Sequence, residues 1–363
     1  MSSTELDISA SFVGQRSGAS DLNRAYAGLR QVIESEGLLD KTPRNYLWQT
    51  ILALSTIATG FALLGAFENL TIHIGAALIL SIGVVQAALV GHDIAHRQVF
   101  RSQQFLSVFG VIFWNFILGA SFRYWTHKHD RHHAHPNHIG KDPDLGAPFL
   151  FSHSQLGSAS RFRRWSARYQ KIYFFLILAL AYFSVVENSI RYLAKEKLSR
   201  SITIEWLLFV FHFVAFFTLF GFLLDWPRVF LLTLIHYVTM GIYLGLIFAP
   251  NHKGLRIYER DESLPHAYRQ VVSSRNIRPH PLVDYFFGGL NYQIEHHLFP
   301  TMPRAHLKRA RELVRSFTTR ESLPYQELNF VGAFCAIYRS FFPLPGLGWK
   351  EKGADEAYVS APH

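Results

Sequence analysis

The residues of this chain that could do chemistry are histidines, and the densest group lies between Trp125 and Asn137. Within that run, His129, His132 and His133 are spaced i, i+3, i+4, which places all three on one stripe of a helix. Imidazole is a good ligand for iron, copper, zinc and nickel. The spacing therefore predicts a metal site, and the alternative is a surface helix that happens to be rich in histidine.

Two further groups support the metal site. His92 and His96 are spaced i, i+4 at the end of an apolar run, where an ionisable side chain is costly unless it has a role. Far downstream, Gln293, His296 and His297 repeat the spacing of the first group. We expect the three groups to meet in one site assembled from distant parts of the chain.

The number of ligands predicts more than one ion. The three groups supply seven imidazoles, whereas a tetrahedral zinc site uses at most four ligands. His252 follows Asn251 at the end of the last apolar run, and we expect it to bind the metal or to contact it through a water. Asp93, Asp130 and Glu295 lie inside the histidine groups, where they are expected to accept hydrogen bonds from ligand imidazoles.

Composition indicates that a membrane surrounds this site. Hydrophobic residues make up 49% of the 363 residues and charged residues 17%, below the roughly 25% of soluble domains. Several continuous apolar runs approach the length of about 20 residues that a membrane span needs. The single cysteine, Cys335, excludes an internal disulfide and a cysteine-based zinc site.

The formal net charge of +10 has two interpretations. Basic residues collect in cytoplasmic segments of membrane proteins, and they also attract acidic partners or phosphate-bearing substrates. A nucleic-acid partner is not expected, because no basic and aromatic nucleic-acid-binding module is visible.

Four apolar runs are predicted to span the membrane as two hairpins. If all histidine groups meet at one site, an even number of crossings must separate them, so two further runs, 105–122 and 172–186, are expected to be interfacial or re-entrant. A basic amphipathic stretch, 152–171, suits a helix on the headgroup surface. The predicted spans are 47–67, 72–90, 206–224 and 229–249.

The predicted fold is therefore an all-α integral membrane protein with interfacial helices and a helical cap that holds the histidines. Nearly all lysines and arginines fall on the histidine side, which predicts a cytosolic active site and cytosolic termini. The predicted organisation is an N-terminal tail with a short helix (1–46), the catalytic domain (47–325) and a C-terminal tail (326–363).

The combined pattern His92-x-x-x-His96, His129-x-x-His132-His133 and Gln293-x-x-His296-His297 resembles the membrane fatty-acid desaturases. The resemblance extends over about residues 45–325. With a glutamine at the start of its third group, the chain resembles one branch of this family. That branch contains the front-end desaturases and the bacterial acyl-CoA or acyl-lipid enzymes related to linoleoyl-CoA desaturase. The flanking sequence motifs that also resemble this family are Gly91-His-Asp, His133-x-His-Pro-Asn137, Asp142-Pro-Asp144, Ala249-Pro-Asn-His-Lys-Gly254 and Asn291-Tyr-Gln-Ile-Glu-His-His-Leu-Phe-Pro300.

The resemblance implies two non-haem irons and a reaction in which O₂ and two electrons introduce a cis double bond into an acyl chain. Gln293 stands where many relatives have a histidine, so it and Asn251 are expected to be weak or water-mediated ligands. The implied iron ligands are His92, His96, His129, His132, His133, His252, His296 and His297.

The resemblance also implies partners. The substrate would be an acyl-CoA or acyl-lipid in a tunnel lined by 72–90 and 229–249. No His-Pro-Gly-Gly motif is present and 46 residues precede the first span, so a separate ferredoxin, flavoprotein reductase or cytochrome is expected as electron donor. The expected location is a bacterial inner or plasma membrane. The basic residues that could contact the headgroup or the donor are Arg97, Arg101, Arg123 and Lys128.

Two alternatives remain at this stage. A related di-iron hydroxylase or carotenoid ketolase would use the same histidine spacing. A metal-binding membrane protein without redox chemistry, such as a transporter, would place its ligands within the spans near the midplane, whereas most histidines here lie at the ends of spans.

Overall fold

The computed structural model describes residues 19–146, 149, 155, 157, 159–258 and 264–341. The outer parts of both predicted tails, 1–18 and 342–363, lie outside the described residues. The described chain is helical apart from turns, an isolated bridge between His138 and Tyr258, and one short parallel pairing of β1 (Asn276–Ile277) with β2 (Glu327–Leu328). The all-α prediction misses this pairing.

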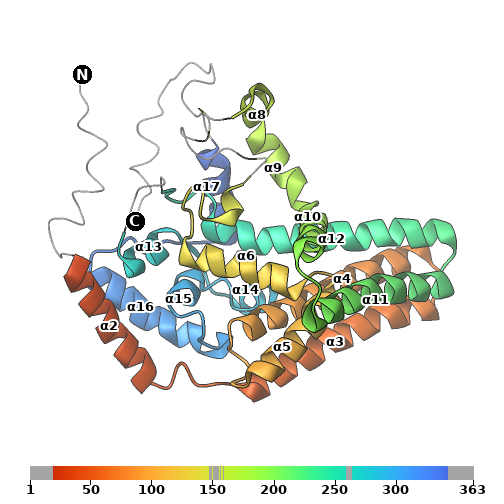
Figure 1. Ribbon diagram of the computed structural model, residues 1–363, viewed down its shortest axis with the longest axis horizontal. Coiled ribbons are helices and arrows are strands. Elements are labelled where there is room, and N and C mark those ends of the chain that lie inside the picture. Colours follow the sequence, from red (N-terminus) through yellow and green to blue (C-terminus); the bar gives the residue numbers. More distant parts are fainter. Residues whose placement is uncertain are drawn as a thin grey trace.

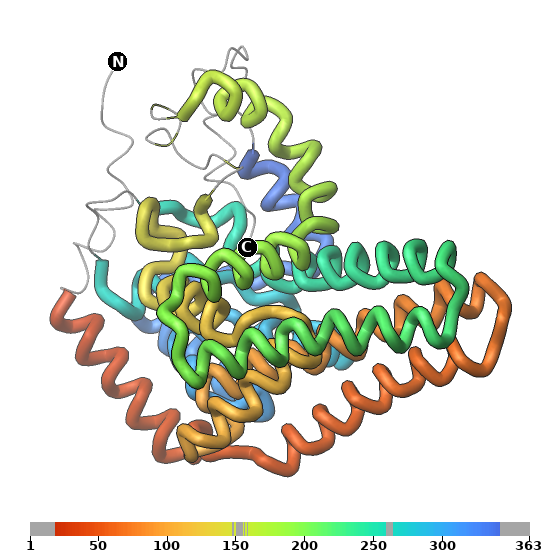
Figure 2. The backbone as a smooth tube through the Cα atoms, turned by 45° about the vertical axis from the view of Figure 1, so that its right-hand side comes forward, coloured from red at the N-terminus to blue at the C-terminus, as the bar shows by residue number. Residues whose placement is uncertain are grey.

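Four helices are long and apolar enough to cross a membrane, and they form two hairpins. Each overlaps one of the predicted spans, although α12 continues to His252. The four lie side by side on the right of Figure 1, and Figure 2 shows the same arrangement from another side. The helices are α3 (Pro43–Ala66), α4 (Leu70–Ala95), α11 (Arg200–Leu223) and α12 (Trp226–His252).

Polar turns close both hairpins at the same end of the molecule (Figure 1). The Asn69 side chain accepts hydrogen bonds from the first backbone N–H groups of α4, and Asp225 does the same for α12. These caps satisfy N–H groups that have no partner within the helix. A Cβ on Gly83 would lie 2.8 Å from Ile57 of α3, so only glycine permits this close approach of α3 and α4.

The predicted run 105–122 is not one helix. Helix α5 (Gln103–Val111) continues into a π-helix, η1 (Ile112–Leu118), and the chain then turns by 106° into α6 (Phe122–Ala134). Gly119 makes this turn with φ +74°, and a Cβ there would lie 2.4 Å from the His212 ring. Because α6 returns to the C-terminal end of α4, the segment leaves and re-enters the same end of the hairpins.

The second run expected to be interfacial is also broken. It forms α9 (Gln170–Leu178) and α10 (Ala181–Lys195), which meet at a bend of 74°. If each bent pair were one span, the chain would have up to six spans instead of four. The basic stretch before it forms the short helix α8 (Arg161–Ala167), and part of that stretch lies outside the described residues.

Short helices form a cap at the end of the hairpins opposite the polar turns (Figures 1 and 2). Their core is separate from that of the hairpins and includes Leu29, Val271 and Val314. The cap helices are α2 (Ala19–Ser35), α13 (His266–Val272), α14 (Pro281–Phe287), α15 (Gln293–Leu298) and α16 (Leu307–Arg320).

The segment predicted to begin the C-terminal tail is structured as far as the description extends. It contains β2 and α17 (Phe330–Ser340), whose Ala333 and Ile337 are buried. Four elements of two or three residues complete the description: β1 and β2 above, and the 3₁₀ turns η2 (Pro143–Leu145) and η3 (Arg304–His306).

Candidate metal centre

The structure brings all eight predicted histidine ligands together where the hairpins meet the cap. His92 lies in the last turn of α4, and His96 is its C-cap residue. His252 is the last residue of α12, so the two buried membrane helices end at the same place. Helix α6 contributes three histidines and α15 contributes two.

Four imidazoles form the first cluster: His92, His96, His129 and His296. One nitrogen from each lies within 4.8 Å of the others. The Nε2 atoms of His96 and His129 are 2.9 Å apart. The Nε2 atoms of His92 and His296 are buried and have no hydrogen-bond partner within the described chain. Four ring nitrogens therefore face a common point.

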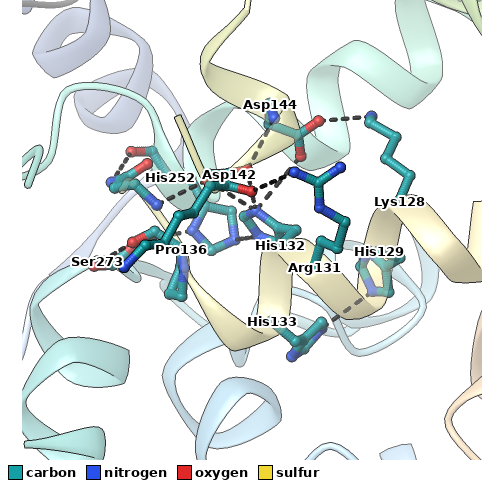
Figure 3. Close-up of polar contacts among 12 residues, drawn as sticks. Lys128, His129, Arg131, His132, His133, Pro136, Asp142, Asp144, His252 and Ser273 are labelled. Carbon is teal, nitrogen blue, oxygen red and sulfur yellow. Dashed lines mark hydrogen bonds and ion pairs between the residues drawn. The ribbon is translucent and has the colours of Figure 1, made fainter. Parts of the chain in front are cut away.

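Three imidazoles form the second cluster: His132, His252 and His297. The Nε2 atom of His252 lies 3.3 Å from that of His132 and 3.1 Å from that of His297 (Figure 3 shows the first of these). His133 lies between the clusters. Its Nε2 is 3.1 Å from His129 Nε2, and its ring stacks on that of His297 with centroids 4.2 Å apart.

Neighbouring groups fix the proton positions in the second cluster. His252 Nδ1 lies 2.7 Å from the carbonyl oxygen of Ser273, which can only accept, so this nitrogen carries the proton. His297 Nδ1 lies 2.9 Å from Gln270 Oε1, and Gln270 Nε2 donates to the carbonyl oxygen of His133. In both rings the unprotonated Nε2 therefore points into the cluster.

A carboxylate orients the ring of His132. Its Nδ1 lies 3.1 Å from both oxygens of Asp142, which also accepts from the backbone N–H groups of Asn137 and Asp144. Asp144 forms an ion pair with Lys128 at 2.6 Å (Figure 3). Burial alone would raise the pKa of Asp144, but Lys128 and His132 hold it well below its usual range. Asp144 is therefore charged at neutral pH.

The first cluster is held by a buried ion pair. His92 Nδ1 lies 2.9 Å from Asp93 Oδ1, as the sequence predicts for an acceptor at that position. Arg304 contacts the other oxygen of Asp93 through Nε and donates from Nη2 to the carbonyl oxygen of Leu89. The Tyr46 hydroxyl also lies 3.0 Å from Asp93. Asp93, Arg304 and Tyr46 thus link α4, the cap and α3.

Two of the predicted acceptors do not contact an imidazole. Asp130 is exposed, because it faces away from the stripe that carries His129 and His133. Glu295 is buried, but its oxygens accept from Asn276 Nδ2 and from the Tyr325 hydroxyl. Burial raises the pKa of Glu295 to about 7. Neither carboxylate therefore orients an imidazole, whereas Asp93 contacts the adjacent His92.

The predicted basic residues divide into two pairs. Arg123 forms an ion pair with the buried Glu205 at 3.1 Å, and Lys128 is engaged with Asp144. Their charges are therefore already balanced inside the protein. Arg97 and Arg101 are exposed near the end of α4.

Sequence reasoning missed several partners of the site. Asp142 and Asp144 belong to one of the flanking sequence motifs noted above, but no feature of the sequence assigned them to His132. Gln270, Ser273 and Arg304 carry no spacing signal, because each comes from a cap segment that only the fold brings to the histidines. Gln270, a polar residue beside Val271 and Val272, carries the one local signal, whereas Ser273 acts through its backbone carbonyl and Arg304 lies in a basic segment.

The arrangement fits a bound cation in each cluster. Ring nitrogens of neighbouring histidines face one another at 2.9 to 3.3 Å. Their lone pairs repel unless a proton or a metal lies between them, and burial disfavours a charged imidazolium. The donor set is all imidazole, which suits iron, copper, zinc or nickel. The two clusters could therefore each hold one metal ion.

Comparison with known proteins is consistent with this geometry. The family model described as fatty acid desaturase matches residues 69–329, which include α4, the second hairpin and every histidine of the two clusters. The chain belongs to the fatty acid desaturase family. It is accordingly an acyl desaturase, an oxidoreductase of the membrane.

The individual relatives are named fatty acid desaturases. The chain is 27% identical over 340 residues to the Delta(5) fatty acid desaturase fat-4 of Caenorhabditis elegans, covering 87% of this chain and 72% of the relative. It is 31% identical over 334 residues to fatty acid desaturase 3 of Bos taurus, covering 87% and 71%. These relatives are eukaryotic, so a bacterial membrane stays a prediction.

Proposed function

We propose that this protein is a di-iron desaturase that introduces a cis double bond into the acyl chain of an acyl-CoA or acyl-lipid. The observation that supports it is the convergence of eight histidines, seven in two clusters and His133 between them, whose ring nitrogens face one another. The relatives' names support a fatty-acyl substrate, and one of them, from Physcomitrium patens, is named an acyl-lipid (9-3)-desaturase.

A pair of bound irons would supply the redox chemistry. Overall, –CH₂–CH₂– + O₂ + 2 electrons + 2 protons gives –CH=CH– and two waters. The proposed ligands are His92, His96, His129 and His296 at one ion and His132, His252 and His297 at the other, with His133 between them.

The remaining contribution of the chain is to orient these ligands and to keep the site dry. Four histidine rings are held through their outer nitrogens, by Asp93, Asp142, Gln270 and the Ser273 carbonyl. Each of these rings therefore keeps its orientation when its inner nitrogen binds a metal ion. The Trp125 ring stacks on His129 with centroids 4.2 Å apart and covers that side of the first cluster. Helices α4 and α12, which end at the site, are the proposed walls of the acyl tunnel.

The proposed orientation places the cap and its histidines in the cytosol. Nearly all basic residues lie on the histidine side of the four apolar helices, in agreement with the positive-inside rule. A separate ferredoxin, flavoprotein reductase or cytochrome is the proposed electron donor. Exposed Arg97 and Arg101 lie near the end of α4, where an acidic donor or a substrate phosphate could reach them.

Metal analysis and product analysis test the proposal together. The purified protein is expected to carry about two irons per chain, since each histidine cluster supplies a set of imidazoles sufficient for one ion. Expression in a host that lacks the activity, followed by mass spectrometry of its lipids, is expected to reveal a new double bond. Full activity with zinc alone would exclude the di-iron assignment, and an alcohol as the only product would indicate a hydroxylase.

A further inference from the structure

The side chain of Asn251 has a fixed orientation. Its amide lies beside the carbonyl oxygen of Leu290, 3.0 Å from the atom assigned as Nδ2. A carbonyl oxygen can only accept a hydrogen bond, so the atom of Asn251 at this position must be the nitrogen. The assignment therefore follows from the contact and not from the way the amide is drawn.

This orientation determines that of Gln293. The same Asn251 Nδ2 lies 3.0 Å from Gln293 Oε1. A donor faces this atom of Gln293, so the atom must be the amide oxygen. Gln293 consequently turns its Nε2 toward the second cluster, where it lies 2.9 Å from His252 Nε2.

The facing nitrogen of His252 is an acceptor. Its other ring nitrogen carries the proton, because it faces the Ser273 carbonyl. Gln293 and Asn251 are both buried, so bulk water does not compete for these hydrogen bonds. The chain of contacts from Leu290 to His252 thus presents an N–H donor, and not an oxygen, to the cluster.

A metal ion in the second cluster would change the partner of this donor. The ion would take the lone pair of His252 Nε2, which the Gln293 amide contacts in the structure. The amide would then need another acceptor, since a buried N–H group without a partner is unfavourable. Three imidazoles leave an open position of the kind that catalytic metal sites keep for water or substrate.

We propose that Gln293 is not a metal ligand but a hydrogen-bond donor that holds a water or a small anion at the open side of the second cluster. The proposal rests on the proposed function, since it needs metal in that cluster. Gln270 provides a contrast on the same cluster. It directs its oxygen to His297 and its nitrogen to a backbone carbonyl, and it therefore orients a ligand.

The test compares Gln293→Leu and Gln293→Glu with the unchanged protein after loading with iron. Leucine removes the donor and any ligand atom, and glutamate replaces the donor by a second oxygen. Gln104→Glu is the matched control, because Gln104 is exposed on α5. Iron per chain is measured by mass spectrometry, and binding of azide to the ferric protein is measured by its visible charge-transfer band.

If Gln293 is a donor, both variants keep the iron content of the unchanged protein. Their dissociation constants for azide rise by about tenfold or more, the loss expected for a hydrogen bond to a charged group. Asn251→Asp is expected to weaken azide binding in the same direction, because an aspartate cannot donate to Gln293. The control keeps both properties.

Other outcomes overturn the inference without affecting the proposed function. Loss of about half the iron in Gln293→Leu, with retention in Gln293→Glu, would show that residue 293 is a ligand. Full iron with unchanged azide affinity in both variants, or no azide binding by the iron-loaded unchanged protein, would exclude the donor role. If Gln293→Leu does not fold, the azide affinity of Gln293→Glu decides. Absence of iron from the unchanged protein would instead contradict the proposed function.

Discussion

The two histidine clusters are oriented by different means. In the first cluster, His92 contacts Asp93, whose charge is balanced by Arg304 in a buried ion pair. In the second cluster, the outer nitrogens face a backbone carbonyl, a side-chain amide and a carboxylate bound by backbone N–H groups. One cluster thus depends on a charge pair between α4 and the cap, and the other on the end of α13 and the segment around Asp142.

This difference has an energetic consequence. Removing one partner of a buried ion pair leaves an uncompensated charge, whereas removing a neutral acceptor costs about one hydrogen bond. Mutations around the first cluster should therefore affect folding and metal together. Replacing the neutral acceptors around the second cluster should affect metal binding with smaller changes in stability.

The largest effect is expected when a ligand itself is removed. His132→Ala should abolish desaturation and remove about half of the bound iron, because His132 belongs to only one cluster. His127→Ala is the control, since His127 lies on the same helix but is exposed. Iron analysis and product formation check both. Wild-type turnover by His132→Ala would contradict the site.

The next effect distinguishes the two clusters. Arg304→Met should lower the free energy of unfolding by about 3–5 kcal/mol, because it leaves Asp93 buried and unpaired. Thermal unfolding in detergent measures this change, and the iron loss should come from the first cluster. Arg304→Lys should recover part of the stability.

Arg309 on α16 offers a matched control for that variant. It forms ion pairs with Glu36 and Glu312 on the surface. Arg309→Met should leave both stability and iron content close to those of the unchanged protein, since exposed pairs contribute little. Equal destabilisation by the two arginine variants would remove the distinction between a buried and a surface pair.

A smaller effect is expected for Gln270→Leu. The variant removes the acceptor of His297 Nδ1 and should weaken metal binding in the second cluster by about 10–100-fold. A competition titration with a chelator measures this affinity. Gln270→Glu keeps an acceptor for His297 and should bind metal more tightly than the leucine variant; the reverse order would exclude the orienting role.

The smallest effect is expected for Asp130→Asn. Asp130 is exposed and lies outside both clusters, although the sequence alone assigns it to the site. Iron content and turnover should both remain at the level of the unchanged protein. A tenfold loss of turnover would restore the original assignment and show that the surface around α6 takes part in the reaction.

Much of this arrangement follows from local sequence. The four spanning helices coincide with four apolar runs, because the length of a run fixes the length of a helix that can remain in a membrane. The bends at 119–121 and 179–180 were not predicted. They depend on packing: Gly119, for example, adopts a left-handed conformation against His212.

The candidate site, too, followed from local sequence only in part. The spacing of His129, His132 and His133 placed them on one stripe, and the structure separates adjacent members of that stripe between clusters, with His129 in the first and His132 in the second.

The sequence by itself determined which residues can bind metal, because helical periodicity is a local property. It also determined that His92, His96 and His252 lie at the ends of the two hairpins. Only the tertiary structure decided how the histidines divide into clusters and which groups orient them. Arg304, Gln270 and Ser273 reach the site from the cap, and such long-range contacts arise from packing that no local pattern encodes.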